Sequence, residues 1–314
     1  MTEKIIAIGN AIVDVVCSVS EDVLIENNLI KSSMSLIDEK ISKNLEKLTP
    51  EKITSGGSAA NTIATAAQFG GDCYFIGRVA NDEFGVKFIN EIEKTRTNFI
   101  GDICHQNSTA KSFILVTPDG ERTMCTFLGC ASNLNKDIII ERHFKDLAIL
   151  YIEGYLWDNS QNSEAIKKAI NFAKNNGAKI AFCLSDIFCV SRHKEDFLKL
   201  LDEVDLVFAN ENEIIELCSA QNFSDKKIVE LFAKRQNLLV IATRSEKGCA
   251  IFNQGKLIEV TTKEVRKIID ATGAGDNFAA GFLSKFLEGK NLEECAAFGN
   301  ELAGKIIRQF GARF

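Results

Sequence analysis

Short apolar runs alternate along this 314-residue chain with longer segments of helical periodicity. The runs predict strands at residues 4–8, 73–77, 147–152, 179–184, 205–209 and 238–242. The longer segments predict helices at 58–69, 82–96, 161–175, 193–202, 211–219 and 224–235, with two more at about 275–288 and 292–308. Repeated strand–helix units are typical of a doubly wound α/β fold, in which helices cover both faces of a mostly parallel sheet.

One segment breaks this alternation. Residues 110–128 (AKSFILVTPDGERTMCTFL) predict two strands around a turn at Pro118-Asp119-Gly120, and the Asp-Gly pair suits a hairpin. A second irregular and partly extended stretch covers residues 11–38. We therefore expect a single domain over residues 1–314, with a small β-sheet lid from about 11–38 and 105–130 inserted in the α/β core.

Composition excludes several classes of partner. The 37 basic and 43 acidic residues give a formal net charge of −6, which disfavours a nucleic-acid binder with a clustered basic face. The longest stretch free of charged residues, 53–71, is rich in Ser, Thr, Asn and Gly, so no membrane span is expected. The short apolar run near the N-terminus does not resemble a secretory signal. We expect a cytoplasmic protein.

The ten cysteines form no disulfide or metal-binding pattern. They are scattered without a C-x-x-C pair, and the three histidines (105, 143 and 193) fall in no ligand spacing. Scattered thiols in a chain of this length are typical of buried, reduced cysteines in a reducing compartment.

The segment 270–276 (DATGAGD) carries the strongest chemical signal. Gly273, Ala274 and Gly275 precede a strong helix pattern, and consecutive backbone N–H groups at a helix N-terminus bind anions. Asp276 would stand beside that anion and accept a proton from an attacking hydroxyl. A glycine-containing turn with a capping aspartate is the structural alternative. Phe278 stands at the third glycine position of the dinucleotide fingerprint, and no P-loop motif occurs.

A second segment and a single aspartate are further candidates for ligand contacts. In SGGSAAN (55–61), two glycines allow close approach of the backbone, and Asn61 offers a donor and an acceptor to a hydroxyl. Asp14, just past the first strand, is either a solvated turn residue or an acceptor for two vicinal hydroxyls. A plain loop with Ser58 as a helix cap is the alternative for the first of these segments.

Polar residues also follow several predicted strands. Glu153 follows strand 147–152, Asn210 and Glu213 follow 205–209, and Thr243 and Arg244 follow 238–242. Ligands of open parallel sheets bind outside the carboxyl ends of the strands. Glu213 with Asn210 is the candidate for holding Mg²⁺ through water, because Mg²⁺ prefers few protein oxygens together with water and phosphate.

Taken together and in this order, GNAIVD (9–14), SGGSAAN, an N-x-x-E after a central strand, TRSEKG (243–248), DATGAGD and FGAR (310–313) resemble the ribokinase (PfkB) family of carbohydrate and nucleoside kinases. The resemblance extends over nearly the whole chain. GNAIVD, SGGSAANT, FIGRVANDEFG and DGERTM are most similar to the adenosine kinase-like branch. The sequence departs from the family at Ala271, where a threonine is usual and Thr272 follows instead.

The resemblance implies a role for each candidate. Asp276 matches the catalytic base, and Gly273, Ala274 and Gly275 match the anion hole for the transferring γ-phosphoryl group. The implied acceptor-binding residues are Asp14, Gly57 and Asn61, with Arg122 on the hairpin expected to close over the site. Tyr155 and Leu156 could wall the acceptor's base, and a core role fits them equally well. The implied nucleotide-binding residues are Asn210, Thr243, Gly248 and Asn300, with Glu213 in the Mg²⁺–phosphate network. Asp270 and Thr272 lie where many members bind a monovalent cation such as K⁺.

We therefore expect an ATP- and Mg²⁺-dependent kinase that phosphorylates the 5′-hydroxyl of a nucleoside, with adenosine as the leading acceptor. The alternative within the family is a kinase of ribose, fructose or a related sugar acid. Two alternatives come from other functional classes. One is a non-catalytic regulator that binds a nucleotide or sugar, and the other is a dinucleotide-dependent oxidoreductase, although the glycine fingerprint for dinucleotide binding is missing. The sequence leaves open a monomer or a homodimer paired through the lid.

Overall fold

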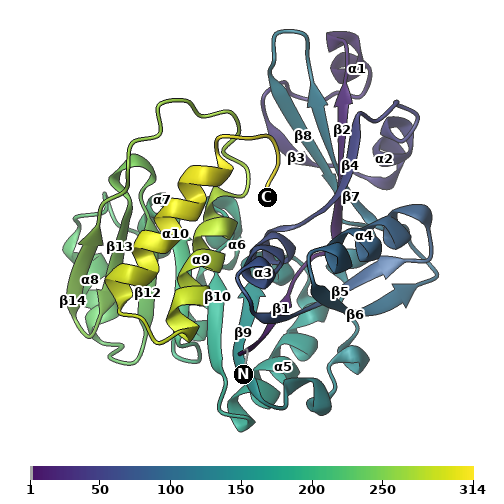
Figure 1. Ribbon diagram of the computed structural model, residues 1–314. Helices are drawn as coiled ribbons and strands as arrows, with labels where there is room; N and C mark the ends of the chain where they lie inside the picture. Colours follow the sequence, from purple (N-terminus) through teal and green to yellow (C-terminus); the bar gives the residue numbers. More distant parts are fainter. Residues whose placement is uncertain (1–2) are drawn as a thin grey trace.

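A nine-stranded sheet forms the centre of the computed structural model, which describes residues 3–314 (Figure 1). The strand order is β14-β13-β12-β11-β10-β9-β1-β5-β6. Neighbouring strands from β12 through to β6 pair in parallel, whereas β13 and β14 are antiparallel additions at one edge. The bounds are β1 (Lys4–Ile8), β5 (Asp72–Ala80), β6 (Thr97–Cys104), β9 (Leu147–Glu153), β10 (Lys179–Cys183), β11 (Leu206–Asn210), β12 (Leu239–Thr243), β13 (Cys249–Asn253) and β14 (Lys256–Val260).

Helices cover both faces of this sheet, as the alternating pattern predicts. The central strand β1 shows the reason, because Ile5 and Ala7 pack into one buried cluster while Ile6 and Ile8 pack into another. The first cluster includes side chains of α3 (Ser58–Gln68), α4 (Glu83–Lys94), α9 (Ala274–Leu287) and α10 (Leu292–Ile306). The second includes side chains of α5 (Ser163–Asn175), α6 (Ile187–Leu200), α7 (Glu211–Leu217) and α8 (Lys226–Ala233). The doubly wound α/β fold is confirmed.

A second, five-stranded sheet projects from the main body (Figure 1). Its strand order is β3-β8-β7-β2-β4. The bounds are β2 (Ile12–Ser18), β3 (Met34–Leu36), β4 (Lys52–Gly56), β7 (Ala110–Val116) and β8 (Arg122–Phe127), and the two short helices α1 (Glu21–Glu26) and α2 (Glu39–Leu45) lie between its strands in sequence. The strands β7 and β8 form the antiparallel hairpin around residues 118–120. The strand β4 also belongs to this sheet, although it lies outside both segments expected to form the lid.

The sequence analysis missed three strands of the main sheet. The strand β6 is an edge strand whose residues are mostly exposed or half-buried, so its apolar pattern is weak. The strands β13 and β14 form a hairpin whose two turn residues, Gln254 and Gly255, both have positive φ (50° and 74°). The predicted helix 193–202 starts earlier, at Ile187, because Asp186 caps it by accepting from the Cys189 N–H (2.7 Å).

All ten cysteines are free, and eight of them are buried. Their burial confirms the structural role expected for them. Within residues 3–314, no helix has both the length and the apolar character needed to cross a membrane.

Candidate active site

Asp276 lies in the first turn of α9 and faces the first turn of α3. Its Oδ1 accepts a hydrogen bond from Ser58 Oγ (2.7 Å), and its Oδ2 accepts one from Asn61 Nδ2 (3.0 Å). The two helices are more than two hundred residues apart in sequence and pack side by side on one face of the main sheet (Figure 1). Both carboxylate oxygens of Asp276 are therefore held in place by α3.

The turn that begins α9 leaves donors for an anion beside Asp276. Gly273 precedes the helix with φ +77°, a left-handed conformation that favours glycine. The Ala274 N–H donates to the Ala271 carbonyl (3.2 Å), while the N–H groups of Gly275 and Asp276 have no acceptor within residues 3–314. Two unpaired N–H groups at the positive end of a helix dipole can stabilise a phosphoryl group.

The C-terminal tail, residues 310–314, packs against this turn. A Cβ added at Gly273 would lie 2.6 Å from the Cβ of Ala312, so only glycine allows the two segments to approach this closely. Asn277 Nδ2 donates to the Ala312 carbonyl (2.9 Å). The chain therefore ends beside α9 and near the small sheet, between the two parts of the molecule (Figure 1).

Asp270 joins the tail, the turn and the hairpin. Its Oδ1 accepts from the N–H and Oγ1 of Thr272 (3.0 and 2.7 Å), and its Oδ2 accepts from the Gly311 N–H (3.0 Å) and pairs with Arg122 Nη1 (2.6 Å). Burial alone would raise the pKa of Asp270, but these bonds hold it below its usual value. The Arg122 guanidinium also lies over the Phe310 ring, 4.9 Å from its centroid. Arg122 is therefore anchored to the loop that leads into α9.

Asp14 and Asn61 line a cavity of about 950 Å³. The small sheet forms one wall through β2, β4 and β7, and the tail forms another. A Cβ added at Gly56 would lie 2.2 Å from Oδ2 of Asp14, so the glycine makes room for this carboxylate. Gly57 has φ +94° and lies against the Asn10 carbonyl, which a Cβ there would approach to 2.4 Å. The two glycines thus serve contacts within the chain.

Opposite charges gather around Asn61, where Asp14 and Arg313 line the cavity and Asp276 accepts from the Asn61 amide. Asp14, Asp276 and Arg313 are half-buried as whole residues, but protein surrounds their charged groups. Loss of hydration raises the pKa of Asp14 to about 7 and that of Asp276 to about 6, and it lowers the pKa of Arg313 to about 10. Arg313 opposes the rise at both carboxyl groups. Asp276 therefore titrates close to neutral pH, where a general base is most effective.

Glu153, the last residue of β9, is buried at the carboxyl end of its strand. Its carboxylate accepts from the N–H groups of Asn10 (2.6 Å) and Ala59 (2.9 Å), and burial raises its pKa to about 7. It therefore links β9 to the loop after β1 and to the first turn of α3. Glu153 is a strand-end carboxylate, as the sequence predicts, and its bonds hold together two segments of the site.

Asn210 and Glu213 form a capping box at the start of α7. Asn210 Oδ1 accepts from the Glu213 N–H (2.9 Å), and the Glu213 carboxylate accepts from both the N–H and the Nδ2 of Asn210. Burial raises the pKa of Glu213 to about 7. Both carboxylate oxygens already have a donor, so the box orders the end of β11 and suits a contact to Mg²⁺ through water better than direct ligation.

The other residues predicted for the nucleotide lie beside this box. Thr243 pairs with Asn210 across β11 and β12, and its Oγ1 donates to the Ala209 carbonyl (3.3 Å). Gly248 has φ +85°, and a Cβ there would lie 2.1 Å from the Val260 carbonyl oxygen. Asn300 on α10 donates Nδ2 to the Val260 carbonyl (3.3 Å) and lies within 3.4 Å of the Thr261 carbonyl. The structure thus brings these four residues to one region.

Tyr155 lies apart from the cavity. It occupies a short 3-10 turn (Gly154–Asp158) after β9, and its side chain packs against the buried cluster that includes α5, α6, α7 and α8. Neither Tyr155 nor Leu156 is among the cavity's lining residues in the described part of the chain. Leu156 is fully buried in the same cluster, which fits the core role that the sequence left open.

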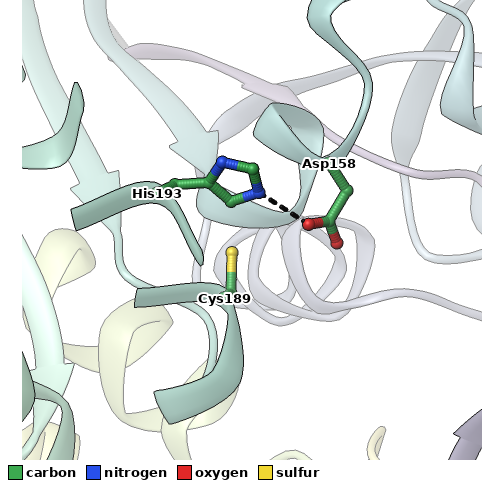
Figure 2. Close-up of side chains that lie close together, drawn as sticks. All are labelled: Asp158, Cys189 and His193. Atoms are coloured by element: carbon green, nitrogen blue, oxygen red, sulfur yellow. Dashed lines mark hydrogen bonds and ion pairs between the residues drawn. The ribbon is translucent and has the colours of Figure 1, made fainter. Parts of the chain in front are cut away.

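A separate polar cluster joins α6 to this turn. Figure 2 shows Asp158, Cys189 and His193, whose potential metal-binding atoms all lie within 4.8 Å of one another. The spacing of the histidines in the sequence does not reveal this group, because Asp158 is distant in sequence from the Cys189–His193 pair. The Asp158 carboxylate accepts three hydrogen bonds from Arg192 and one from His193 Nε2 (2.7 Å). The Arg192 guanidinium already balances the charge of the Asp158 carboxylate. The cluster therefore fixes α6 near His193, whose backbone dihedral angles are not helical.

Sequence reasoning also missed two residues of the acceptor side. Ser58 appears there only as a possible helix cap, yet it contacts the proposed base. Arg313 appears only within FGAR, and its position five residues after the predicted end of the last helix, residue 308, gives no signal of a contact. Its Nε donates to Asn61 Oδ1 (2.9 Å), and Nη1 bonds Ser55 Oγ on β4. Its contacts follow from tertiary packing alone.

A carboxylate beside a helix N-terminus, at the carboxyl edge of a doubly wound sheet, fits the class of small-molecule phosphotransferases. The model of the pfkB family of carbohydrate kinases matches residues 4–314, and the chain belongs to this family. The chain is accordingly an ATP-dependent kinase that phosphorylates a hydroxyl group.

Three relatives illustrate the range of the family. The adenosine kinase of Sinorhizobium meliloti is 36% identical, with a TM-score of 0.89 over 100% of this chain and 96% of that structure. A probable sugar kinase protein from Rhizobium etli CFN 42 is 35% identical, with the same TM-score, over 100% of this chain and 96% of that structure. The adenosine kinase of Saccharomyces cerevisiae is 26% identical over 100% of this chain and 97% of its own length.

Proposed function

We propose that this kinase transfers the γ-phosphoryl group of ATP to the 5′-hydroxyl of adenosine, forming AMP and ADP. The observation that carries the proposal is the composition of the 950 Å³ cavity, which joins hydroxyl-binding groups to an apolar wall. Asp14 and Asn61 lie at one side of it, and Val16, Ile114 and Val116 of the small sheet also line it.

The apolar wall follows from the register of the small sheet. Val16 on β2 pairs with Ile114 on β7, and Asp14 lies two residues before Val16 on the same face of its strand. One face of the sheet therefore presents a carboxylate for ribose hydroxyls and aliphatic side chains for a flat base. A monosaccharide is smaller and has no flat aromatic base, so it would leave much of this wall without a partner.

The chemistry requires a base and a stabilised phosphoryl group. Asp276 takes the proton of the acceptor hydroxyl, whose oxygen forms a bond to the γ-phosphorus as the bond to the β-phosphate oxygen breaks. The N–H groups of Gly275 and Asp276 donate to the oxygens of the group in transfer, and ADP leaves. Mg²⁺ bound to ATP supplies charge neutralisation, and the Asn210–Glu213 box would contact the hydrated ion.

Two of the three relatives described above are named adenosine kinases, which supports the nucleoside over a sugar as acceptor. The name of the Rhizobium etli relative favours the alternative, a sugar kinase of the same family acting on ribose, fructose or a related acid. We propose no K⁺ site at Asp270 and Thr272, because Thr272, Gly311 and Arg122 already occupy the Asp270 carboxylate.

The test measures ADP release and the phosphorylated product with Mg-ATP, with and without K⁺. The acceptors are adenosine, other nucleosides, ribose and fructose, and Asp276→Asn serves as the inactive control. We expect turnover with adenosine and little with free sugars.

Turnover with a sugar alone would replace the nucleoside proposal by the alternative. ATP binding without turnover of any acceptor would favour a regulator and overturn the proposed reaction.

A further inference from the structure

The guanidinium of Arg313 lies where three distant segments meet. Its Nε donates to Asn61 Oδ1 on α3 (2.9 Å), and its Nη1 bonds Ser55 Oγ on β4. Its Nη2 is buried and has no partner among residues 3–314. Arg313 also lines the cavity together with Asp14 and Asn61. The penultimate residue of the chain is therefore part of the acceptor end of the site.

The chemistry of the three groups fixes the orientation of the Asn61 amide. Arginine has only donors, and an ionised carboxylate has only acceptors. Asn61 lies between Arg313 and Asp276, so its oxygen must face Arg313 and its nitrogen must face Asp276, as observed. Without Arg313, only the bond to Asp276 would hold the amide, and its oxygen would lose its donor. Arg313 thus restrains Asn61 in the orientation that donates to Asp276.

The charges around Asp276 show why a cation matters there. Ser58 and Asn61 on α3 donate to the carboxylate, and Arg313 is the cation that acts on it from the tail. The other titratable groups that sense its charge are Asp14 on β2, Tyr151 and Glu153 on β9, and Cys183 on β10. Two of these are carboxyl groups whose pKa the charge of Asp276 raises, and Arg313 opposes that rise at Asp14.

We propose that Arg313 is a positioning residue for phosphoryl transfer: it holds Asn61 in the orientation that donates to Asp276 and places a positive charge at the acceptor end of the site. The C-terminal tail is thereby a working part of the active site. The kinetic part of this proposal rests on Asp276 being the base of the proposed function, whereas the ionisation of Asp276 can be measured without any acceptor.

Three variants separate charge from geometry. Arg313→Met removes both the charge and the hydrogen bonds, and Arg313→Lys keeps the charge but not the planar two-point contact. Arg308→Met is the matched control, since Arg308 is exposed near the tail and its side chain makes no hydrogen bond within the described residues. Thermal unfolding of each variant establishes that it folds.

The first readout is the pH dependence of turnover with whichever acceptor the screen identifies. For Arg313→Met we expect kcat to fall about 10- to 100-fold, because the base is misplaced. The acid limb of the profile should move up by about one pH unit, because a nearby cation is lost. For Arg313→Lys we expect a lower kcat with an acid limb close to that of the unchanged protein.

The second readout needs no acceptor. The ¹³C signal of the Asp276 carboxyl, assigned by its loss in Asp276→Asn, is titrated in the unliganded protein. We expect its midpoint to rise in Arg313→Met and to stay in place in Arg308→Met.

Unchanged midpoints in a folded Arg313→Met protein would overturn the proposal, even if the acceptor is a sugar. A higher kcat or a lower acceptor KM in Arg313→Met would also overturn it, because the tail would then be a plug that competes with the acceptor. Failure of adenosine as substrate, with a raised midpoint for Asp276, would instead count against the proposed function alone.

Discussion

The proposed acceptor side and the proposed nucleotide side of the site are built in different ways. On the acceptor side, Asp14, Asn61, Asp276 and Arg313 come from four segments of the chain and act on one another through hydrogen bonds and charge. On the nucleotide side, Asn210 and Glu213 bond across a single helical turn, and Gly248 provides a left-handed turn between two strands. The comparison shows that the charges of the acceptor side depend on long-range packing, while the capping box and the Gly248 turn of the nucleotide side depend on local backbone geometry.

The largest expected effect is at the base of the acceptor side. Asp276→Asn should lower kcat by about 10²- to 10⁴-fold, because the acceptor hydroxyl loses its general base. The hydrogen bond from Ser58 can persist, so the fold should be retained. Steady-state turnover and a circular-dichroism melt test this together. Near-normal kcat in the folded variant would mean that another group takes the proton.

The pH profile of the unchanged protein tests whether the acceptor-side charges are coupled. The raised pKa of Asp276, about 6, means that the base becomes protonated as the pH falls through that value. We expect kcat to fall about tenfold per pH unit below it. Protonation of Asp14, whose pKa is about 7, should raise the acceptor KM over a slightly higher range. A plateau in kcat extending down to pH 4 would contradict a desolvated base.

The turn before α9 offers a matched pair of glycines. Gly273→Ala introduces a Cβ at φ +77°, against Ala312, and should lower the free energy of unfolding by about 1–3 kcal/mol. In Gly275→Ala the new Cβ meets no atom within 4 Å, and we expect a gain of about 0.5–1 kcal/mol from helix propensity. Denaturant unfolding of both variants measures the difference. Equal effects would show that the tail does not constrain this turn.

The smallest expected effect is at the capping box of the nucleotide side. Glu213→Ala should lower the free energy of unfolding by about 1 kcal/mol, because the Asn210 N–H at the start of α7 loses its acceptor. Asn212→Ala in the same helical turn, at an exposed position, is the control and should change stability little. The KM for Mg-ATP, measured alongside, shows whether Glu213 also contacts the hydrated ion. If Glu213→Ala proves as stable as Asn212→Ala, helix capping does not explain the N-x-x-E motif.

Much of the fold was predictable because the deciding signals are local. The runs at 4–8 and 147–152 match β1 and nearly all of β9, and residues 118–120 form the turn of the small sheet's hairpin. The strand β6 and the hairpin of β13 and β14 were missed, since edge strands need no continuous apolar run. The strand β4 was missed because its last residues belong to a glycine motif that suggested a loop.

The candidate site was predictable to a similar extent. DATGAGD marks both the turn and the carboxylate, because a helix N-terminus with small residues is a local property. The side-chain partners of that carboxylate were not predictable in the same way. Ser58 and Asn61 lie more than two hundred residues away, and whether they reach Asp276 depends on how α3 packs against α9.

The sequence by itself determined the alternation of most strands and helices, the hairpin turn at residues 118–120 and the capping box of α7. Each depends on contacts among residues close together in the chain. Only the tertiary structure decided the ionisation of Asp14 and Asp276, the place of Arg313 between them, and the position of Tyr155 outside the cavity. The physical reason is that hydration and charge depend on every group that packing brings near, whatever its place in the sequence.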